Sequence, residues 1–218
     1  MKSKKPLLTS RILAILEATY PEAKTTLEWK TPFQLLVATV LSAQSTDKAV
    51  NKATKKLFED HPDPESFAKL SPEELKSYIK TVGLSSAKAR HLVEADRMIL
   101  ENFEGQVPRT LEELMSLPGV GRKTGNVVLS NAFGIPAIAV DTHVYRVSHR
   151  LGLTSSKSFL GTEKELMEAI PKEKWSQAHH WLIHHGRAIC KSKPLCSICP
   201  LNEICPRVGV RRETRGGG

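Results

Sequence analysis

The sequence predicts an all-α fold of about ten helices. Apolar residues recur at the spacing of one helix face in the stretches RILAILEATY and TPFQLLVATVLSA, and again from Ala87 to Phe103. Glycines and prolines follow the ends of these stretches, where helices stop. The one strand-like run is IPAIAV, residues 135–140, which is too short to build a sheet. We interpret this run as a connection between two helical regions.

Two helix starts can be predicted from capping residues. Ser71 and Pro72 supply an N-cap and a proline at the first helical position, and Glu74 completes a capping box. Residues 162–165, Thr-Glu-Lys-Glu, repeat this pattern before the run LMEAI. The pattern predicts helices that begin next to Ser71 and Thr162.

The composition indicates an ordinary globular protein with a basic surface. The chain has 218 residues, of which 40% are hydrophobic, enough for one large domain or two small ones. Its 32 Lys and Arg outnumber 23 Asp and Glu, giving a net charge of +9. This excess favours a polyanionic partner, nucleic acid or an anionic membrane, although a merely soluble basic surface is the alternative.

The two ends of the chain carry basic residues. The basic and then apolar N-terminus is interrupted by Arg11 and Glu17, so we expect neither an export signal nor a membrane span. Residues 211–218, RRETRGGG, are expected to form a disordered basic tail.

A glycine-rich segment, LPGVGRKT at residues 117–124, lies between the predicted helix TLEELMSL and the apolar stretch NVVLSNAF. Two glycines one residue apart allow a tight turn, and a turn that opens a helix points unpaired N–H groups outward. Such a turn is a ready phosphate site. The segment is similar to the helix-hairpin-helix element that binds the DNA backbone; a plain helix–helix turn is the alternative.

Two residues are candidates for chemistry. Lys123 is expected near the start of a helix beside Arg122, and both the helix dipole and this charge favour a neutral, nucleophilic amine. Taken alone, it could equally be a phosphate-binding or solvated lysine. Asp141 follows the connection and precedes THVYRVSHRLG, where it is expected to cap a helix. Capping and catalysis can coexist in one aspartate.

All four cysteines lie in the last stretch of the chain, in CKSKPLCSICPLNEIC. Zinc, an iron–sulfur cluster or two disulfides could each account for them, and disulfides rank lowest in a chain of this length without a signal peptide. Structural zinc sites usually pair two C-x2-C hooks, whereas here one hook is flanked by a five-residue gap on each side. The spacing therefore favours a cubane cluster. The four candidate ligands are Cys190, Cys196, Cys199 and Cys205.

Five segments together resemble the endonuclease III family of base-excision DNA glycosylases. They are LLVATVLSAQSTD, YIKTVGLSSAKA, LPGVGRKTGNVVL, VDTHVYRVSHRLG and HHWLIHHGRAIC, and the resemblance runs from the first helix to Cys205. It implies a bifunctional glycosylase and apurinic/apyrimidinic (AP) lyase that removes oxidised pyrimidines from damaged double-stranded DNA after flipping the base. We also expect a monomer without membrane contact, and the lack of a targeting segment is consistent with a bacterial, nucleoid-associated, cytoplasmic protein.

The resemblance implies a role for individual residues. Lys123 matches the nucleophile that attacks the sugar C1′ and forms a Schiff base, and Asp141 matches its partnering carboxylate. Gln44 would fill the hole left by the flipped nucleotide, and Leu84 would wedge beside the orphan base, although each could equally be structural. Further DNA contacts are expected from Pro118, Gly119, Val120, Gly121, Arg122, His143, Lys191 and Lys193.

The family fold implies two helical lobes with the active site in the groove between them. Residues 25–135 would form a six-helix barrel with the hairpin at about 111–130, and residues 1–24 plus 136–210 a lobe that carries a [4Fe–4S] cluster on the four cysteines. The chain departs from the family in two places. The first cysteine gap has five residues instead of six, and Gly125 replaces a common alanine, which costs helix stability of about 1 kcal/mol.

Two other functions compete with this one. A related glycosylase could act on another lesion or a mismatch, and a non-catalytic DNA-binding protein could use a metal-stabilised C-terminus. The histidines of HHWLIHH could suggest a metal face, but next to four cysteines we interpret them as packing and DNA-side charge. They are His179, His180, His184 and His185.

Overall fold

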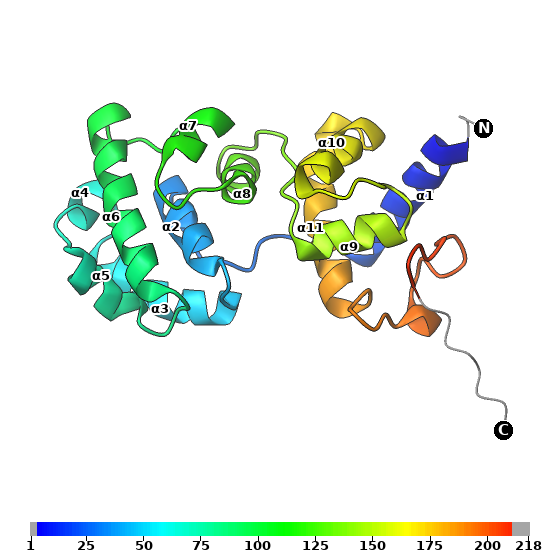
Figure 1. Ribbon diagram of the computed structural model, residues 1–218, viewed down its shortest axis with the longest axis horizontal. Helices are drawn as coiled ribbons and strands as arrows, with labels where there is room; N and C mark the ends of the chain where they lie inside the picture. The colour runs from blue at the N-terminus through cyan, green and yellow to red at the C-terminus, as the bar shows by residue number, and fades with distance from the viewer. Residues whose placement is uncertain (1–3, 211–218) are drawn as a thin grey trace, which may run out of the picture. The chain divides into compact units, whose positions relative to one another are not determined.

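The fold is that of a computed structural model, and the structure describes residues 4–210. Within this range the chain forms eleven α-helices and two 3-10 helices, and no β-strand (Figure 1). The predicted all-α fold is confirmed. No helix in this range is both long and apolar enough to cross a membrane. The predicted disordered tail, residues 211–218, lies outside the described residues.

The chain divides into two compact units. One runs from Thr25 to Ala137, and the other joins the residues up to Lys24 with those from Ile138 onward. Each unit has its own buried apolar core. The chain therefore passes between the units twice.

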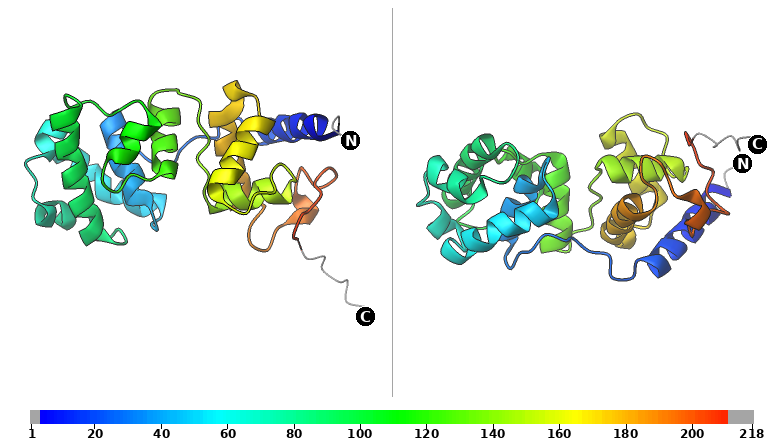
Figure 2. Two further views of the ribbon diagram at one scale, coloured as in Figure 1. Left: turned by 45° about the horizontal axis from the view of Figure 1, so that its top comes forward. Right: turned by 90° about the horizontal axis from the view of Figure 1, so that it is seen from below.

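The unit from Thr25 to Ala137 is built around one buried helix. Every residue of α2 from Phe33 to Leu41 is buried, and α2 contacts α3, α6 and α8 (Figure 2). A helix that is apolar on all sides is stable only when other elements surround it. The helices of this unit are α2 (Pro32–Ser42), α3 (Asp47–Asp60), α4 (Pro64–Phe67), α5 (Pro72–Ile79), α6 (Ser85–Asn102), α7 (Leu111–Ser116) and α8 (Arg122–Ala132).

The second unit is built around α11, which contacts α1 and α9. Trp181 of α11 is only 1% exposed and is the largest fully buried side chain of the protein's described part. Helix α9 in turn contacts α10. The α-helices of this unit are α1 (Lys4–Thr19), α9 (Thr142–Arg150), α10 (Phe159–Ala169) and α11 (Trp175–Ala188), and the 3-10 helices are η1 (Lys172–Lys174) and η2 (Cys196–Ile198).

One of the two predicted helix starts is confirmed. Ser71 caps α5 in a complete capping box: its Oγ accepts from the Glu74 N–H at 3.2 Å, and Glu74 Oε2 accepts from the Ser71 N–H at 2.8 Å. The start predicted at Thr162 is wrong. Helix α10 begins one turn earlier because Ser158 provides the cap, accepting from the Gly161 N–H at 3.0 Å. Thr162 is instead completely buried inside this helix.

The strand-like run at residues 135–140 has no regular secondary structure and connects α8 to α9. Its interpretation as a connection is confirmed. Ile138 and Val140 are buried in the core of the second unit, at 0% and 5% exposed. The apolar side chains therefore fix the path of the chain just before Asp141, where α9 starts.

Helix α6 carries a carboxylic acid in the core of its unit. Asp96 is 1% exposed, and neither of its carboxyl oxygens has a hydrogen-bond partner among the described residues. Burial raises the pKa of Asp96 to about 7, and the negative charges of Glu65 and Asp63 contribute to this rise. Burying an unpaired carboxylate is costly, so the protonated form is favoured in the folded protein.

We expect this acid to make the free energy of unfolding fall as the pH rises from about 4 to about 7. In this window the unfolded chain has released the Asp96 proton while the folded chain still holds it, so the unfolded state binds fewer protons and stability falls. Asp96→Asn should remove this slope and stabilise the protein above pH 7 by on the order of 2 kcal/mol. Denaturant unfolding at about pH 5 and about pH 8 measures the effect. Glu94→Gln, on the exposed face of the same helix, is the control. An unchanged slope in Asp96→Asn would contradict the assignment.

Candidate functional site

The predicted DNA-binding hairpin is a tight turn between α7 and α8. The N–H of Val120 donates to the carbonyl of Leu117 at 3.1 Å. Gly119 has a φ of +78°, and a Cβ here would lie 3.0 Å from the Cβ of His91 on α6. Both the backbone conformation and the available space therefore require glycine. Val120 points into the core at 6% exposed, whereas Pro118 is half-buried.

Helix α8 begins with an open, positively charged end. Gly121 is its N-cap, and no side chain caps this end. Arg122 and Lys123 are the first two helical residues, and both are exposed. The first N–H groups of a helix and the positive end of its dipole attract anions, and two adjacent cations add to this attraction. The arrangement is suited to a phosphate group.

Packing against α2 and α7 fixes the direction of α8. Residues Thr124–Ser130 are buried, so the exposed Lys123 is anchored on a helix that cannot rotate freely. Gly125 stands at the contact with α7: a Cβ there would lie 2.7 Å from Leu111 Cδ1. The Leu111 side chain thus occupies the space that an alanine methyl group would need. An alanine here, which helix propensity favours, would require the end of the Leu111 side chain to shift.

Asp141 is held by the helix that it caps. Its Oδ1 accepts from the N–H groups of His143 and Val144, both at 2.8 Å, so the predicted capping of α9 is confirmed. Both bonds end on the same carboxylate oxygen. Asp141 belongs to the second unit and Lys123 to the first. Their joint action stays a prediction.

Gln44 and Leu84 lie on two linked turns of the first unit. Both are exposed and both have left-handed backbones, with φ values of 55° and 59°. Leu84 is the N-cap residue of α6 and is 60% exposed, an unusual position for a large apolar side chain. The N–H of Gly83 donates to Ser45 Oγ at 3.1 Å, which joins one turn to the other. The structure therefore brings together two residues that are 40 positions apart in the sequence.

His143 is half-buried and packs against α11. Its Nδ1 accepts from Arg146 Nη2 at 3.1 Å, and the same guanidinium donates to the carbonyls of Gly186 (3.1 Å) and Cys190 (3.0 Å). Arg146 thus connects the start of α9 with the first cysteine. Sequence reasoning missed Arg146. Its spacing from Arg150 along one helix face was the available signal.

The four cysteines line a single small pocket of about 20 Å³. All four are free thiols, so no disulfide joins them. Cys190 is buried and the other three are partly buried. In the part of the chain that the structure describes, no group of three or more His, Cys, Asp or Glu is arranged to hold a single metal ion.

Hydrogen bonds surround this cysteine pocket. Arg150 Nη1 donates to Cys190 Sγ at 3.5 Å, the Arg207 N–H donates to Cys205 Sγ at 3.4 Å, and His185 Nε2 lies 3.6 Å from Cys199 Sγ. Donors of this kind stabilise thiolates and metal-bound sulfur. Burial raises the pKa of the Cys199 and Cys205 thiols, and the neighbouring cysteines add to this rise. The donor set of four thiols fits a metal group held by cysteine.

Hydrogen bonds to backbone groups hold the shortened loop between Cys190 and Cys196 in place. Arg150 donates to the carbonyls of Lys191 (2.5 Å) and Ser192 (3.0 Å), and the Leu195 N–H donates to Ile189 at 3.1 Å. The side chains of Lys191 and Lys193 are exposed. The loop therefore keeps both predicted basic residues at the surface.

The histidines of α11 mainly pack. His179, His180 and His185 are buried, and Tyr20 Oη lies 3.1 Å from His185 Nδ1. Burial lowers the pKa of His180 and of His185 to about 4. These two are therefore uncharged at neutral pH, and the expected DNA-side charge does not apply to them. The packing part of the prediction is confirmed.

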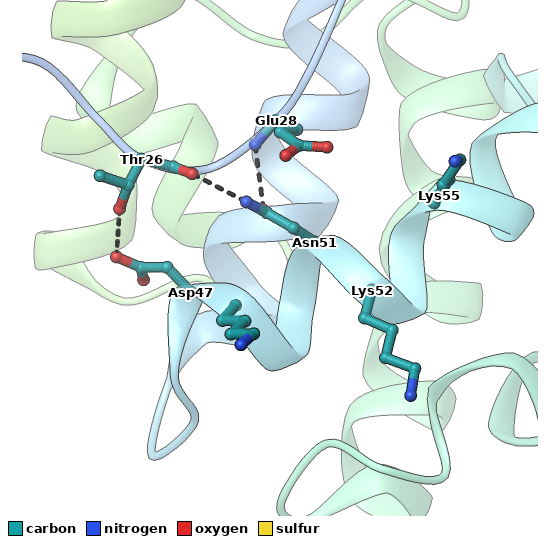
Figure 3. Close-up of a pocket in the computed structure, with 7 residues that line it drawn as sticks. Thr26, Glu28, Asp47, Asn51, Lys52 and Lys55 are labelled. Carbon is teal, nitrogen blue, oxygen red and sulfur yellow. Dashed lines mark hydrogen bonds between the residues drawn. The ribbon is translucent and has the colours of Figure 1, made fainter.

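A separate shallow pocket of about 550 Å³ lies beside α3 and contains none of the predicted site residues. Figure 3 shows that Asn51 bonds to the backbone of Thr26 and Glu28, at 2.8 and 3.0 Å, while Thr26 donates to Asp47. Lys52 and Lys55 project away from these bonds (Figure 3). The bonds attach the segment that enters the first unit to α3, which is a structural role.

Known proteins share this arrangement. Residues 37–172 match the model of the HhH-GPD superfamily of base excision DNA repair proteins. Endonuclease III of Bacillus subtilis is 50% identical over 90% of this chain and 90% of its own length. The chain belongs to the endonuclease III family. This membership confirms the prediction of a base-excision repair DNA glycosylase with AP lyase activity.

Two solved structures of family members have the same fold. A non-covalent endonuclease III–DNA complex has a TM-score of 0.88 at 48% identity and covers 93% of this chain and 95% of its own. A trapped covalent endonuclease III–DNA intermediate has a TM-score of 0.86, also at 48% identity, and covers 91% and 96%. The resemblance to endonuclease III, which began with five sequence segments, therefore covers nearly the whole described fold.

We expect Gly119→Ala to destabilise the protein and weaken DNA binding. The positive φ is unfavourable for alanine, and the new methyl group would also be too close to His91. We expect a loss of about 1–3 kcal/mol in the free energy of unfolding. Gly134→Ala is the matched control, because Gly134 also has a positive φ (+65°) but a Cβ there would meet nothing within 4 Å. Urea unfolding of both variants measures the difference. Equal losses would show that the His91 contact contributes nothing.

Proposed function

We propose that this endonuclease III family member removes oxidised pyrimidines from duplex DNA and cleaves the resulting AP site, with Lys123 as the nucleophile. The observation that carries the proposal is the exposed position of Lys123 at the open start of α8. A second argument is that a protein 48% identical to this chain has been trapped as a covalent intermediate with DNA. DNA is thus the proposed partner, and the open hairpin is suited to its phosphates.

In the proposed reaction Lys123 first acts as the nucleophile and then supplies the nitrogen of the imine. Its neutral Nζ attacks the sugar C1′, the bond from C1′ to the damaged base breaks, and the base leaves with the bonding electrons and takes up a proton. Loss of the amine proton and opening of the sugar ring give an imine between Nζ and C1′. The imine acidifies the C2′ proton, and its removal expels the phosphate at C3′. The strand is therefore cut on the 3′ side of the lesion.

Asp141 is proposed to stabilise the positive charge that develops at C1′. Its Oδ1 already accepts two backbone N–H groups, so we assign the substrate-facing role to Oδ2. Because Lys123 and Asp141 belong to different units, the proposal requires both units to bind the same nucleotide.

Gln44 and Leu84 are proposed to enter the duplex from the first unit. A flipped nucleotide leaves a hole in the stack and an unpaired partner base. The amide of Gln44 suits the polar edge of that hole, and the exposed Leu84 side chain suits a position against the orphan base. Arg122, Lys191 and Lys193 would bind phosphates, which contribute affinity without reading sequence.

Borohydride trapping tests the nucleophile. Incubation with a duplex that carries one thymine glycol, followed by reduction, should give a covalent protein–DNA adduct, because the imine is converted into a stable amine. Lys123→Ala should form no adduct, whereas Arg122→Ala, which changes the adjacent exposed cation, should still form it with weaker DNA binding. Trapping by Lys123→Ala would refute the role of Lys123. Failure of a folded, DNA-binding wild type to trap this lesion would favour a relative that acts on another base.

We further propose that Cys190, Cys196, Cys199 and Cys205 bind a [4Fe–4S] cluster. Support comes from four free thiols around one pocket and from the N–H groups of Arg150 and Arg207, which donate to two of the sulfur atoms. Such a cluster supplies a rigid anchor, with accessible redox chemistry, for the loop that carries Lys191 and Lys193. Arg150 would position this loop through its backbone carbonyls.

Metal analysis tests the cluster. The purified protein should be brown and contain about four iron atoms and four sulfide ions per chain, as a cubane requires. Cys199→Ser should lower the iron content and the thermal stability together, because the metal group stabilises the folded loop. Zinc in place of iron, in a colourless protein, would contradict the proposal. Ser197→Ala, a change in the same exposed segment that removes no thiol, is the control.

A further inference from the structure

The C-terminal end of the buried helix α2 presents carbonyl groups that need hydrogen-bond partners. Helices leave their last carbonyls without intrahelical partners, and burial makes an unpaired carbonyl costly. Three of these groups are satisfied within the turn that follows: the carbonyl of Thr39 by Ser42 Oγ, that of Val40 by the Ala43 N–H, and that of Ser42 by the Ser45 N–H.

Lys88 of α6 satisfies two further carbonyls of this end. Its Nζ donates to the carbonyl of Leu41 at 2.8 Å and to that of Ala43 at 2.5 Å. Lys88 is only 5% exposed, and burial lowers the pKa of its ammonium group. The negative end of the α2 dipole offsets part of the cost of this burial. Lys88 is therefore an internal cap, supplied by a different helix.

The same ammonium group reaches the turn before α6. Its Nζ lies 3.4 Å from Ser45 Oγ, which in turn accepts from the Gly83 N–H at 3.1 Å. A Cβ at Gly83 would lie 3.1 Å from the carbonyl oxygen of Gln44, so the two turns are in close contact. The backbone N–H of Lys88 also donates to the carbonyl of Leu84 at 3.0 Å. One buried lysine thus holds the turn of Gln44 and the turn of Leu84 together.

Both turns contain a conformation that side chains rarely adopt. Gln44 and Leu84 have positive φ values without being glycine. Such backbone conformations persist only where the surrounding structure enforces them, and they cluster at sites that bind ligands. The side chains that they display are exposed, while the backbone beneath them is fixed by Lys88 and Ser45. A lysine that served only to cap α2 would not need to reach Ser45.

We infer that Lys88 is a positioning residue that fixes Gln44 and Leu84 for insertion into the DNA duplex. The inference rests on the proposed function, since it assigns no contact between Lys88 and DNA. Its physical basis is preorganisation: two turns that are already in place lose less freedom when their side chains enter the stack. Lysine suits this role because its three donors can serve acceptors in three directions, whereas a guanidinium is a planar fork.

The test compares a paired lesion with an unpaired one. Single-turnover base release is measured for thymine glycol in a full duplex and for the same lesion inside a mismatched bubble, where the stack is already open. Lys88→Met retains the apolar stem and loses the donors. We expect it to slow release from the duplex by at least about tenfold and release from the bubble by less than about threefold, because extrusion is costly only in the duplex. Lys76→Met, which removes an exposed lysine of α5, controls for the loss of one charge.

Two further variants separate positioning from folding. Ser45→Ala removes the hydrogen bond between the two turns and leaves the buried side chains in place. It should slow base release from the duplex specifically, but less than Lys88→Met does. Lys88→Met combined with Gln44→Ala and Leu84→Ala should release the base no more slowly than Gln44→Ala with Leu84→Ala, because Lys88 acts through these two side chains. Imine trapping at an AP site should be retained in Lys88→Met and in Ser45→Ala, which shows that the catalytic Lys123 is intact.

Three results would overturn the inference. They are a normal duplex rate in both Lys88→Met and Ser45→Ala, an equal loss on the duplex and the bubble, and full additivity in the combined variant. An equal loss on both substrates, or full additivity, would mean that Lys88 only caps α2. A wild type that releases no base, or a Gln44→Ala and Leu84→Ala variant with an unchanged duplex rate, would instead refute the proposed function on which the inference rests.

Discussion

The burial of α2 is the constraint on which the first unit depends. Nine consecutive residues, Phe33–Leu41, are removed from water, so other helices must cover every face of α2. Helix α8 covers one face, and this contact sets where Lys123 emerges. Helix α6 covers another and supplies Lys88 to the polar end of α2. The same packing that stabilises the core therefore determines where the exposed, chemically important side chains lie.

In the second unit the corresponding constraint is the contact between α9 and α11. Gly186 allows α11 to approach α9 closely, because a Cβ there would lie 3.0 Å from the Cβ of His143. Across this contact Arg146 and Arg150 reach the backbone of the cysteine loop. The helix that Asp141 caps is thus the helix that carries both arginines.

Local sequence patterns were sufficient for the all-α fold and for the helix starts at Ser71 and Asp141. The apolar spacing of α2 and α6, the capping box of Ser71 and the cap of Asp141 depend on residues within one or two turns of one another. The start of α10 was misplaced because two serine or threonine caps compete within four residues, and burial of Thr162 decides between them. Burial is a property of the tertiary fold, which a local pattern does not contain. The contacts that sequence reasoning missed are likewise long-range: Lys88, Arg146 and Arg150 bond to backbone groups 40 or more positions away. Every residue type has the same backbone carbonyl, so no sequence motif indicates which carbonyl needs a hydrogen-bond partner.

The candidate residues all lie at helix ends. Lys123 stands at the start of α8, Asp141 at the start of α9, Leu84 at the start of α6, and Gln44 just beyond the end of α2. The starts of α6 and α8 have no side-chain cap, and the dipole of a helix is positive at its start. An all-α protein has few other places where backbone groups can meet a charged ligand. For a polyanion such as DNA, the open helix start beside Arg122 and Lys123 provides the positive potential that a sheet edge or loop cluster would supply in another fold.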